Sequence, residues 1–214
     1  AFQGELGAYS HLACLKIFSN VDIKACRTFA EVFNLASENS EYRIVIPITN
    51  SSTGSVADMN YLIPQFKLQI HAEYFEKVSH NLLGIMGSEM KDIKTVRSHA
   101  QALGQCSKFI SKNNLISIVS SDTAGSAKFI SEKKDKNQSA IASELAAKIY
   151  NLKIIKPNIE DESGNVTRFL IMGKNSEHPE YDDKKKYITS CIFKLKSIPA
   201  ALYKALGGFA TNSV

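Results

Sequence analysis

A short polar stretch, Asn165-Val166-Thr167-Arg168-Phe169, carries an amide, a hydroxyl and a guanidinium within four residues. It runs into an apolar segment at 169–172 that is typical of a buried strand, so its polar groups are expected to be held rigidly at the start of that strand. Such a group of donors favours the binding of an anion. Short motifs also match by chance, and an N-x-T sequence or an ordinary strand start fits the same residues. The stretch therefore points to a site only in combination with what lies upstream.

Four upstream turns carry similar chemistry, each placed after a predicted strand and before a predicted helix. In α/β folds, helix N-termini beyond the strand ends present free N–H groups and partial positive charge. Each turn alone fits a simple helix cap, whereas their convergence would line a cleft with neutral donors suited to a carboxylate-bearing ligand. The turns are Asn50-Ser51, Ser98 to Gln101, Asp122-Thr123 and Ser143.

Strands and helices alternate along the chain, which predicts an α/β fold with largely parallel sheets. Apolar or β-branched runs predict strands over 42–48, 81–86, 95–97, 116–119 and 139–142. Capping residues followed by apolar periodicity predict helices that start near Ser10, Thr28, Val56, Ser98, Asp122 and Ser143.

The alternating elements are expected to form two lobes with the cleft between them. The segment 151–169 would return the chain to the first lobe. We therefore predict the first lobe at about 1–78 and 157–174, and the second lobe at about 79–156.

The C-terminal part of the sequence changes character. Residues 175–186 are polar and without periodicity, which predicts a linker. Beyond it, 187–195 alternates like a strand and Pro199 opens a predicted helix. A lone strand and helix indicate the beginning of a second domain over 187–214. Because the sequence also begins without Met in a turn-like segment, we interpret it as a piece cut at both ends.

Composition excludes several classes of function. The net charge of the 214 residues is +5, but the lysines are scattered and the run 184–186 follows two aspartates, without the aromatic residues that stack on bases. Nucleic-acid binding is therefore disfavoured, and the positive surplus would instead attract a small anion. No apolar run approaches the ~20 residues of a membrane helix and no signal peptide opens the sequence, so a cytoplasmic protein is expected. The cysteines and histidines lack ligand spacing, which predicts reduced thiols and no metal.

These residues resemble the prephenate dehydratase family over essentially the whole chain. The resemblance implies a two-lobed catalytic domain like the type II periplasmic binding proteins, followed by a ferredoxin-like α+β ACT domain that binds phenylalanine as feedback inhibitor. Residues 187–214 look like the start of that ACT domain. The matching stretches are F-Q-G-E-L-G-A-Y-S-H at 2–11, P-I-T-N-S-S-T-G-S-V at 47–56, S-H-A-Q-A-L-G-Q-C at 98–106, D-T-A-G-S-A-K at 122–128, A-I-A-S at 140–143 and N-V-T-R-F at 165–169.

Three departures from the family pattern bear on function. Thr49 stands where the family usually has glutamate, and Ala100 where it usually has proline. The usual G-A-L of the ACT signature reads Ala200-Ala201-Leu202, and the later E-S-R-P motif is absent. The first departure removes a carboxylate near the expected site. The second loosens the start of the predicted helix but leaves His99 and Gln101 in place, and the third bears on regulation by phenylalanine.

The resemblance implies decarboxylation of prephenate with loss of its ring hydroxyl, a reaction that needs no redox or electron-sink cofactor. Thr167 matches the family's essential threonine and is assigned to the departing hydroxyl, with His99 as rival general acid or as a neutral histidine that orients a turn. Arg168 either clamps a substrate carboxylate or ties the lobes together through an ion pair. The remaining predicted substrate-binding residues are Asn50, Ser51, Ser98, Gln101 and Thr123.

Two alternatives to prephenate dehydration stay open at this point. Arogenate differs from prephenate only in carrying an amino group where prephenate has a keto group, and Thr49 favours a non-catalytic, two-lobed module that binds small anions. The resemblance also implies a homodimer or homotetramer and L-phenylalanine as a possible inhibitor of the full-length protein.

Overall fold

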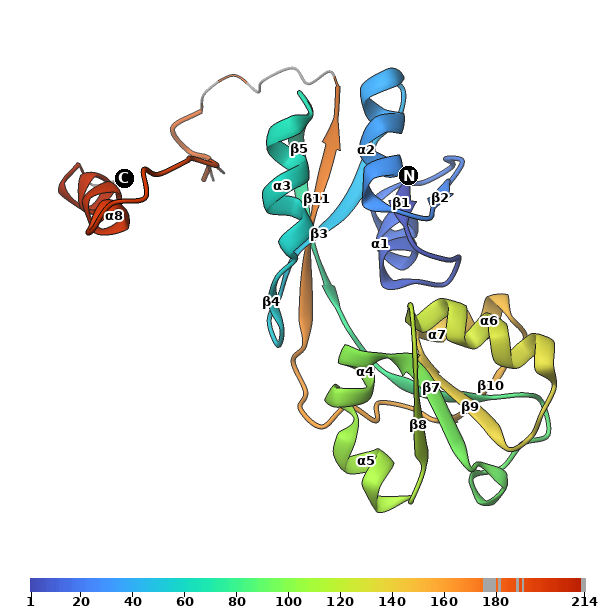
Figure 1. Cartoon of the computed structure of the whole chain (residues 1–214). Coiled ribbons are helices and arrows are strands. Elements are labelled where there is room, and N and C mark those ends of the chain that lie inside the picture. The colour runs from blue at the N-terminus through green and yellow to red at the C-terminus, as the bar shows by residue number, and fades with distance from the viewer. Residues whose placement is uncertain (175–179, 181, 188, 190, 213–214) are drawn as a thin grey trace. The chain divides into compact units, whose positions relative to one another are not determined.

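A computed structural model describes residues 1–174, 180, 182–187, 189 and 191–212. The chain divides into two compact units, Ala1–Glu177 and His178–Val214. Within the first unit, Figure 1 shows two lobes, each built around its own sheet. This is the two-lobed α/β arrangement that was predicted.

The sheet of the first lobe has four strands in the order β4-β3-β11-β5, and every neighbouring pair is antiparallel. The prediction of largely parallel sheets is therefore wrong for this lobe. The chain returns from the second lobe as a central strand that separates β3 from β5, two strands that run the same way. The strands are β3 (Ile44–Asn50), β4 (Gly54–Ser55), β5 (Gln69–Lys77) and β11 (Val166–Gly173).

Alternation along β11 divides the core of the first lobe into two layers. Phe169 and Ile171 pack with Phe2, Val45 and residues of α1 on one face. Leu170 and Met172 pack on the other face against α2 and α3. The helices are α1 (Tyr9–Ile17), α2 (Phe29–Glu38) and α3 (Ala57–Gln65), and a short parallel pair, β1 (Phe2–Gln3) and β2 (Ala25–Cys26), lies beside them.

The predicted helix starts of the first lobe are partly correct. Thr28 caps α2, since its Oγ1 accepts from the Glu31 N–H at 3.2 Å. Ser10 is not a cap, because α1 already begins at Tyr9 after Ala8. Asn50-Ser51 does not start a helix either: Asn50 ends β3, and α3 begins only at Ala57.

The five-stranded sheet of the second lobe is mixed, in the order β10-β6-β9-β7-β8. Strand β7 runs parallel to β8 and β9, as expected, whereas β6 runs antiparallel to β9 and β10. The strands are β6 (Asn81–Gly84), β7 (Thr95–His99), β8 (Ile116–Ser120), β9 (Gln138–Ala142) and β10 (Lys153–Lys156).

Helices cover both faces of this second sheet. Leu82, Val96 and Ile141 pack on the side of α4 and α5, and Leu83 and Ala140 on the side of α6 and α7. The helices are α4 (Ala100–Gln105), α5 (Ser107–Lys112), α6 (Thr123–Lys133) and α7 (Glu144–Ile149), with a 3-10 turn, η1, at Met90–Asp92.

In the second lobe, the sequence predicted helix caps reliably and partly exposed strands less well. Asp122 and Ser143 cap α6 and α7 as predicted, since their side chains accept from the N–H groups of Gly125 and Ala146. The single helix expected after Gln101 is two short helices that meet at Cys106. Strands β5 and β10 were not predicted, because partly exposed strands such as these lack a continuous apolar run.

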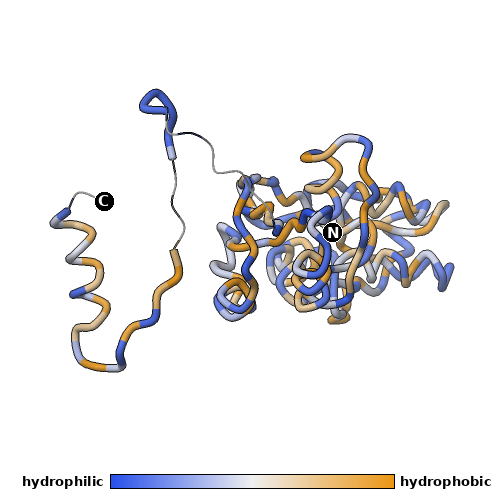
Figure 2. The backbone as a smooth tube through the Cα atoms, turned by 90° about the horizontal axis from the view of Figure 1, so that it is seen from above, coloured by the Kyte–Doolittle hydropathy of each residue, from blue (hydrophilic) through white to orange (hydrophobic). Residues whose placement is uncertain are grey.

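The second unit contains one helix among its described residues, α8 (Ala201–Thr211), which begins two residues after Pro199. The strand predicted at 187–195 is wrong for the residues described there, which form none, and a strand without a neighbour leaves its N–H and C=O groups unpaired. Several residues of α8 have the colour of hydrophobic residues in Figure 2, but none of the residues of this helix is buried. Residues 175–179 and 181 of the predicted linker lie outside the described residues. No described helix is both long and apolar enough to cross a bilayer.

Candidate active site

Thr167 and Asn50 face each other across neighbouring strands at one end of the first sheet. They are register partners of β11 and β3, and Asn50 Nδ2 donates to Thr167 Oγ1 at 2.9 Å. Thr167 is 9% exposed. Because its oxygen accepts from an amide, the hydroxyl proton stays available, and no acceptor for it is found among the described residues.

The amide of Asn50 is fixed by its own turn. Its Oδ1 accepts from the backbone N–H groups of Ser52 at 3.0 Å and Thr53 at 3.1 Å. This Asx-type turn points the NH₂ group toward β11. Ser51 fixes the same junction, since its Oγ accepts from Val166 N at 2.9 Å and its N–H donates to Val166 O at 2.9 Å.

Hydrogen bonds continue from Asn50 into the second lobe. Asn50 Nδ2 also donates to Asn165 Oδ1 at 2.6 Å, and Asn165 Nδ2 donates to Gln105 Oε1 at 3.1 Å. Gln105 Oε1 lies 2.8 Å from Nε2 of His80. The other ring nitrogen of His80, Nδ1, lies 3.0 Å from the Tyr9 hydroxyl. These contacts form one polar network of Thr167, Asn50, Asn165, Gln105, His80 and Tyr9.

Ser98 and His99, which were predicted to bind substrate or to act in catalysis, form hydrogen bonds with backbone groups of the second sheet and of α4. Ser98 is fully buried, and its Oγ donates to Ile141 O at 2.7 Å. His99 is the N-cap of α4, and its Nδ1 accepts from Gln101 N at 3.3 Å. In the neutral ring this leaves the proton on Nε2, for which no acceptor is found in the described part of the chain.

Helix α4 connects this turn with the polar network. Its six residues span about 9 Å, with His99 before its start and Gln105 at its end. Gln101 is exposed one turn before Gln105. The His99 turn thus lies within one short helix of the network that holds Thr167.

Thr123 is the first residue of α6 and is partly exposed. Its neighbour Asp122 caps the helix, with Oδ1 accepting from Gly125 N at 2.5 Å. No hydrogen bond among the described residues joins Thr123 to the polar network.

Arg168 alternates to the sheet face opposite Thr167, on the side of Leu170. Its Nε donates to Glu73 Oε2 at 2.7 Å, and the two side chains are 29% and 30% exposed. Glu73 belongs to β5 of the same sheet. The ion pair of Arg168 therefore lies within the first lobe, and the alternative in which it ties the lobes together is wrong.

The position of Thr49 clarifies the missing carboxylate. Thr49 is the register partner of Arg168, whereas Asn50 is the partner of Thr167. Directly paired residues share a face of a sheet. A glutamate at this position would thus lie beside Arg168, on the face that Thr167 does not occupy, and here Glu73 supplies the carboxylate for Arg168.

Several titratable groups lie beside Thr167 or in the polar network. Glu76, the β5 register partner of Thr167, is 4% exposed and accepts from Lys16 Nζ at 2.7 Å. Burial raises the pKa of Tyr9 well above its usual range and lowers the pKa of His80, although the bond to Gln105 and the charge of Glu160 oppose the latter shift. Burial raises the pKa of Cys106 to about 12, so its thiol stays protonated beside Gln105.

Sequence reasoning missed three members of the network as site residues, Gln105, His80 and Tyr9, and it gave Asn165 a place in the polar stretch without a separate role. One signal for Gln105 was present, because residues four apart on a helix share a face and Gln101 had been selected. His80 follows β5, a strand that was not predicted.

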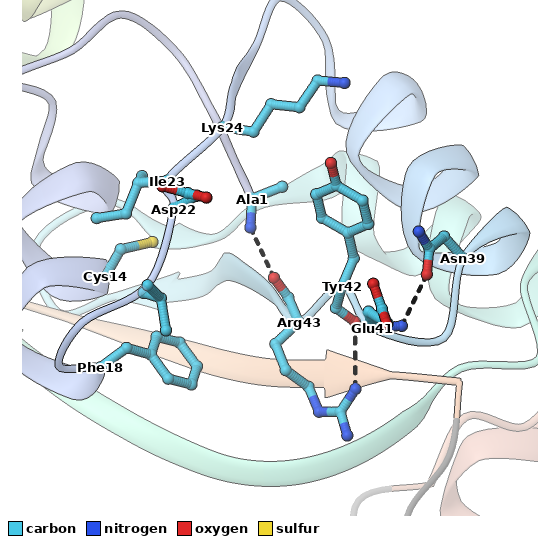
Figure 3. A pocket seen from close by; sticks show the side chains of 11 residues that line it. Ala1, Cys14, Phe18, Asp22, Ile23, Lys24, Asn39, Glu41, Tyr42 and Arg43 are labelled. Atoms are coloured by element: carbon cyan, nitrogen blue, oxygen red, sulfur yellow. Dashed lines mark hydrogen bonds between the residues drawn. The ribbon is translucent and has the colours of Figure 1, made fainter.

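A pocket of about 590 Å³ lies elsewhere, at the N-terminal end of the first lobe. In Figure 3 the Ala1 amino group donates to Arg43 O, at 2.6 Å. None of the predicted site residues lines it. Its lining residues are Ala1, Cys14, Phe18, Val21, Asp22, Ile23, Lys24, Asn39, Glu41, Tyr42 and Arg43. Among the described residues, no group of three or more His, Cys, Asp or Glu side chains is placed to hold a metal ion.

The sequence profile of the family described as prephenate dehydratase matches residues 1–177. A bifunctional N-acyl-homoserine lactone acylase/prephenate dehydratase of Komagataeibacter europaeus is 36% identical, over 100% of this chain and 76% of the relative. Arogenate dehydratase/prephenate dehydratase 1 of Arabidopsis thaliana is 39% identical, over 100% of this chain and 54% of the relative. The chain thus spans about half the length of that plant enzyme.

The fold also matches a solved structure. A prephenate dehydratase of Arthrobacter aurescens, in complex with L-Phe, superposes with a TM-score of 0.82 at 23% identity, over 98% of this chain and 71% of the other. At this identity the likeness concerns the fold.

Proposed function

The chain belongs to the prephenate dehydratase family, and from this premise we propose that it converts prephenate to phenylpyruvate. The bond from the ring to its carboxylate breaks and releases carbon dioxide, while the electron pair moves into the ring. The ring C–O bond breaks, and the departing hydroxide takes a proton to become water. Aromatisation drives the reaction, so the protein's task is to position the dianion and to stabilise the departing hydroxide.

The observation that carries the proposal is the bond from Asn50 Nδ2 to Thr167 Oγ1 at 2.9 Å. It occupies the oxygen of Thr167 as an acceptor and leaves the O–H to donate to the departing hydroxide. A threonine hydroxyl is a weak acid, so we assign it hydrogen-bond donation in the transition state, with water as the proton carrier. One preorganised donor of this kind is worth about 10²–10³ in rate.

The other predicted residues keep supporting roles in this proposal. His99 offers an Nε2–H, and Gln101 an exposed amide, from the start of α4. Asn50 and Ser51 hold the end of β3 against β11, and Ser98 anchors β7 to β9. We assign substrate binding to Thr123 at the start of α6. We assign it also to the terminal NH₂ groups of Arg168, since Glu73 already occupies its Nε.

Two alternatives define what must be measured. Arogenate carries an amino group where prephenate has a keto group, and a plant relative is named for both substrates. The non-catalytic anion-binding module was favoured by the missing carboxylate at Thr49. It loses that support, because Thr49 is the register partner of Arg168 and lies on the sheet face opposite Thr167.

The test is a turnover assay of the purified chain with prephenate and with arogenate, following phenylpyruvate, phenylalanine and carbon dioxide. Formation of phenylpyruvate from prephenate supports the proposal. Product from arogenate alone would assign the other substrate. Binding of prephenate by calorimetry without any product would assign the binding module.

Regulation and assembly form a separate part of the proposal. We propose that residues 187–214 begin an ACT domain, that L-phenylalanine inhibits the longer protein, and that the protein works in the cytoplasm as a homodimer or homotetramer. The L-Phe complex of the Arthrobacter structure supports the second point. The free, buried Cys14, Cys26 and Cys106 support a reducing compartment.

A further inference from the structure

We propose that His80 is a positioning residue for the dehydration, and that Tyr9 holds its ring in the tautomer that fixes Gln105. The inference rests on the proposed function, because the Gln105 amide supports the Asn165–Asn50 pair that orients Thr167. Neither His80 nor Tyr9 touches Thr167. Their effect is transmitted through directional hydrogen bonds.

The direction of the polar network is set at Asn50. Its Oδ1 accepts two backbone N–H groups, so its Nδ2 is the atom that faces Asn165 and Thr167. Asn165 must therefore offer Oδ1 to Asn50 at 2.6 Å and Nδ2 to Gln105 at 3.1 Å. This places the carbonyl oxygen of Gln105, rather than its NH₂ group, between Asn165 and His80.

The oxygen of Gln105 requires a donor from His80. The His80 Nε2 lies 2.8 Å from it, so this nitrogen must carry the proton. His80 is 2% exposed, and burial lowers its pKa, which favours the neutral ring near neutral pH. In that ring Nδ1 has no proton, and the Tyr9 hydroxyl, 3.0 Å away, is the donor placed to meet it.

The Tyr9 hydroxyl can form a hydrogen bond with the His80 ring in either its neutral or its charged form. Its one hydroxyl proton has two acceptors within reach: Ser79 O at 2.6 Å, to which it donates, and His80 Nδ1 at 3.0 Å, to which it can turn. When the ring takes up a second proton, Nδ1–H donates to Tyr9 and Tyr9 donates to Ser79 O. The Nε2–H bond to Gln105 persists in both states. The carboxylate of Glu160 bonds to the His80 backbone, since its Oε2 accepts from the His80 N–H at 3.0 Å.

The network also spans both connections between the lobes. His80 lies between β5 and β6, Asn165 directly precedes β11, and Gln105 at the end of α4 joins them. Loss of the His80 donor would leave the Gln105 oxygen with one partner and free its side chain to rotate. The predicted consequence is a misoriented Thr167 hydroxyl, which lowers kcat and leaves KM nearly unchanged.

Two substitutions of His80 separate its two ring nitrogens. The amide nitrogen of glutamine reaches the place of Nε2, and the amide group of asparagine reaches only the place of Nδ1. We expect His80→Asn to lower kcat with prephenate by about tenfold or more at a KM within twofold. His80→Gln should restore kcat to within about threefold of the wild type. Equal turnover of the two variants, or a change confined to KM, would overturn the inference.

A second measurement does not depend on turnover or on the stability of a variant. In the ¹⁵N-labelled wild-type chain, two-bond ¹H–¹⁵N correlation spectra at pH 8 should show His80 with its proton on Nε2. In Tyr9→Phe the same ring should show a mixture of tautomers. A proton on Nδ1 in the wild type, or an unchanged ring in Tyr9→Phe, would contradict the proposal. Absence of wild-type turnover would instead remove the proposed function and leave this spectrum as the test of the tautomer.

Discussion

The two lobes use similar polar residues in different ways. At the end of the first sheet, Asn50 and Thr167 bond side chain to side chain and hold one another's orientation. At the strand ends of the second lobe, His99, Asp122 and Ser143 accept from the N–H groups of their own helices. Polar side chains at strand ends therefore build a preorganised donor in one lobe and capped helix starts in the other.

This difference follows from the topology of the sheets. In the first lobe the antiparallel pair of β3 and β11 sets Asn50 directly opposite Thr167, so two distant segments supply one constellation. In the second lobe each polar turn passes straight into a helix whose first N–H groups need acceptors. A polar turn after a strand is thus an equally good signal for either outcome.

The largest expected effect is at Thr167. Thr167→Ala removes the donor while the bulk of β11 stays, so kcat with prephenate should fall about 10²–10³-fold. Thr167→Ser keeps the hydroxyl and should retain most of the turnover. Both are compared by steady-state kinetics, with circular dichroism to check the fold. Near-wild-type turnover of the alanine variant would show that Thr167 is not a catalytic donor, and the first lobe would then not differ from the second in this respect.

An intermediate effect is expected at His99. His99→Asn keeps an acceptor for the Gln101 N–H and removes the ring nitrogen Nε2. If His99 only binds substrate, kcat/KM should fall about tenfold through KM, the size of one lost hydrogen bond of about 1.4 kcal/mol. A fall of kcat by a hundredfold at constant KM would make His99 the general acid instead. Kinetics at several pH values separate the two outcomes.

The smallest expected effect is at Ser143. Its Oγ accepts from Ala146 N at 3.0 Å and donates to Gly7 O at 2.6 Å. Ser143→Ala should lower the free energy of unfolding by about 1 kcal/mol, measured in urea, with little change in kcat. A large loss of kcat in a variant of unchanged stability would place this turn in the active site and extend the donor set to the second lobe.

Local chemistry was predictable because it depends on neighbours in sequence. The caps at Thr28, Asp122 and Ser143 were predicted correctly, since an acceptor side chain and the N–H groups that it satisfies lie within three residues. The hydroxyl of Thr167 was also selected from the sequence, through its polar stretch and the family resemblance. Ser10 failed as a cap because a serine also fits inside the first turn of α1.

By itself the sequence determined the two-lobed α/β class, the family and most of the capped helices, because periodicity, capping and motif spacing are all written along the chain. Tertiary structure decided that β11 enters the first sheet as a central antiparallel strand, that Thr49 and Arg168 share the face away from Thr167, and that Gln105, His80 and Tyr9 stand behind the candidate site. Strand order and register depend on pairings between segments more than 100 residues apart, as between Asn50 and Thr167. A pattern read along one segment cannot contain its distant partner, and for that reason the network was visible only in the folded chain.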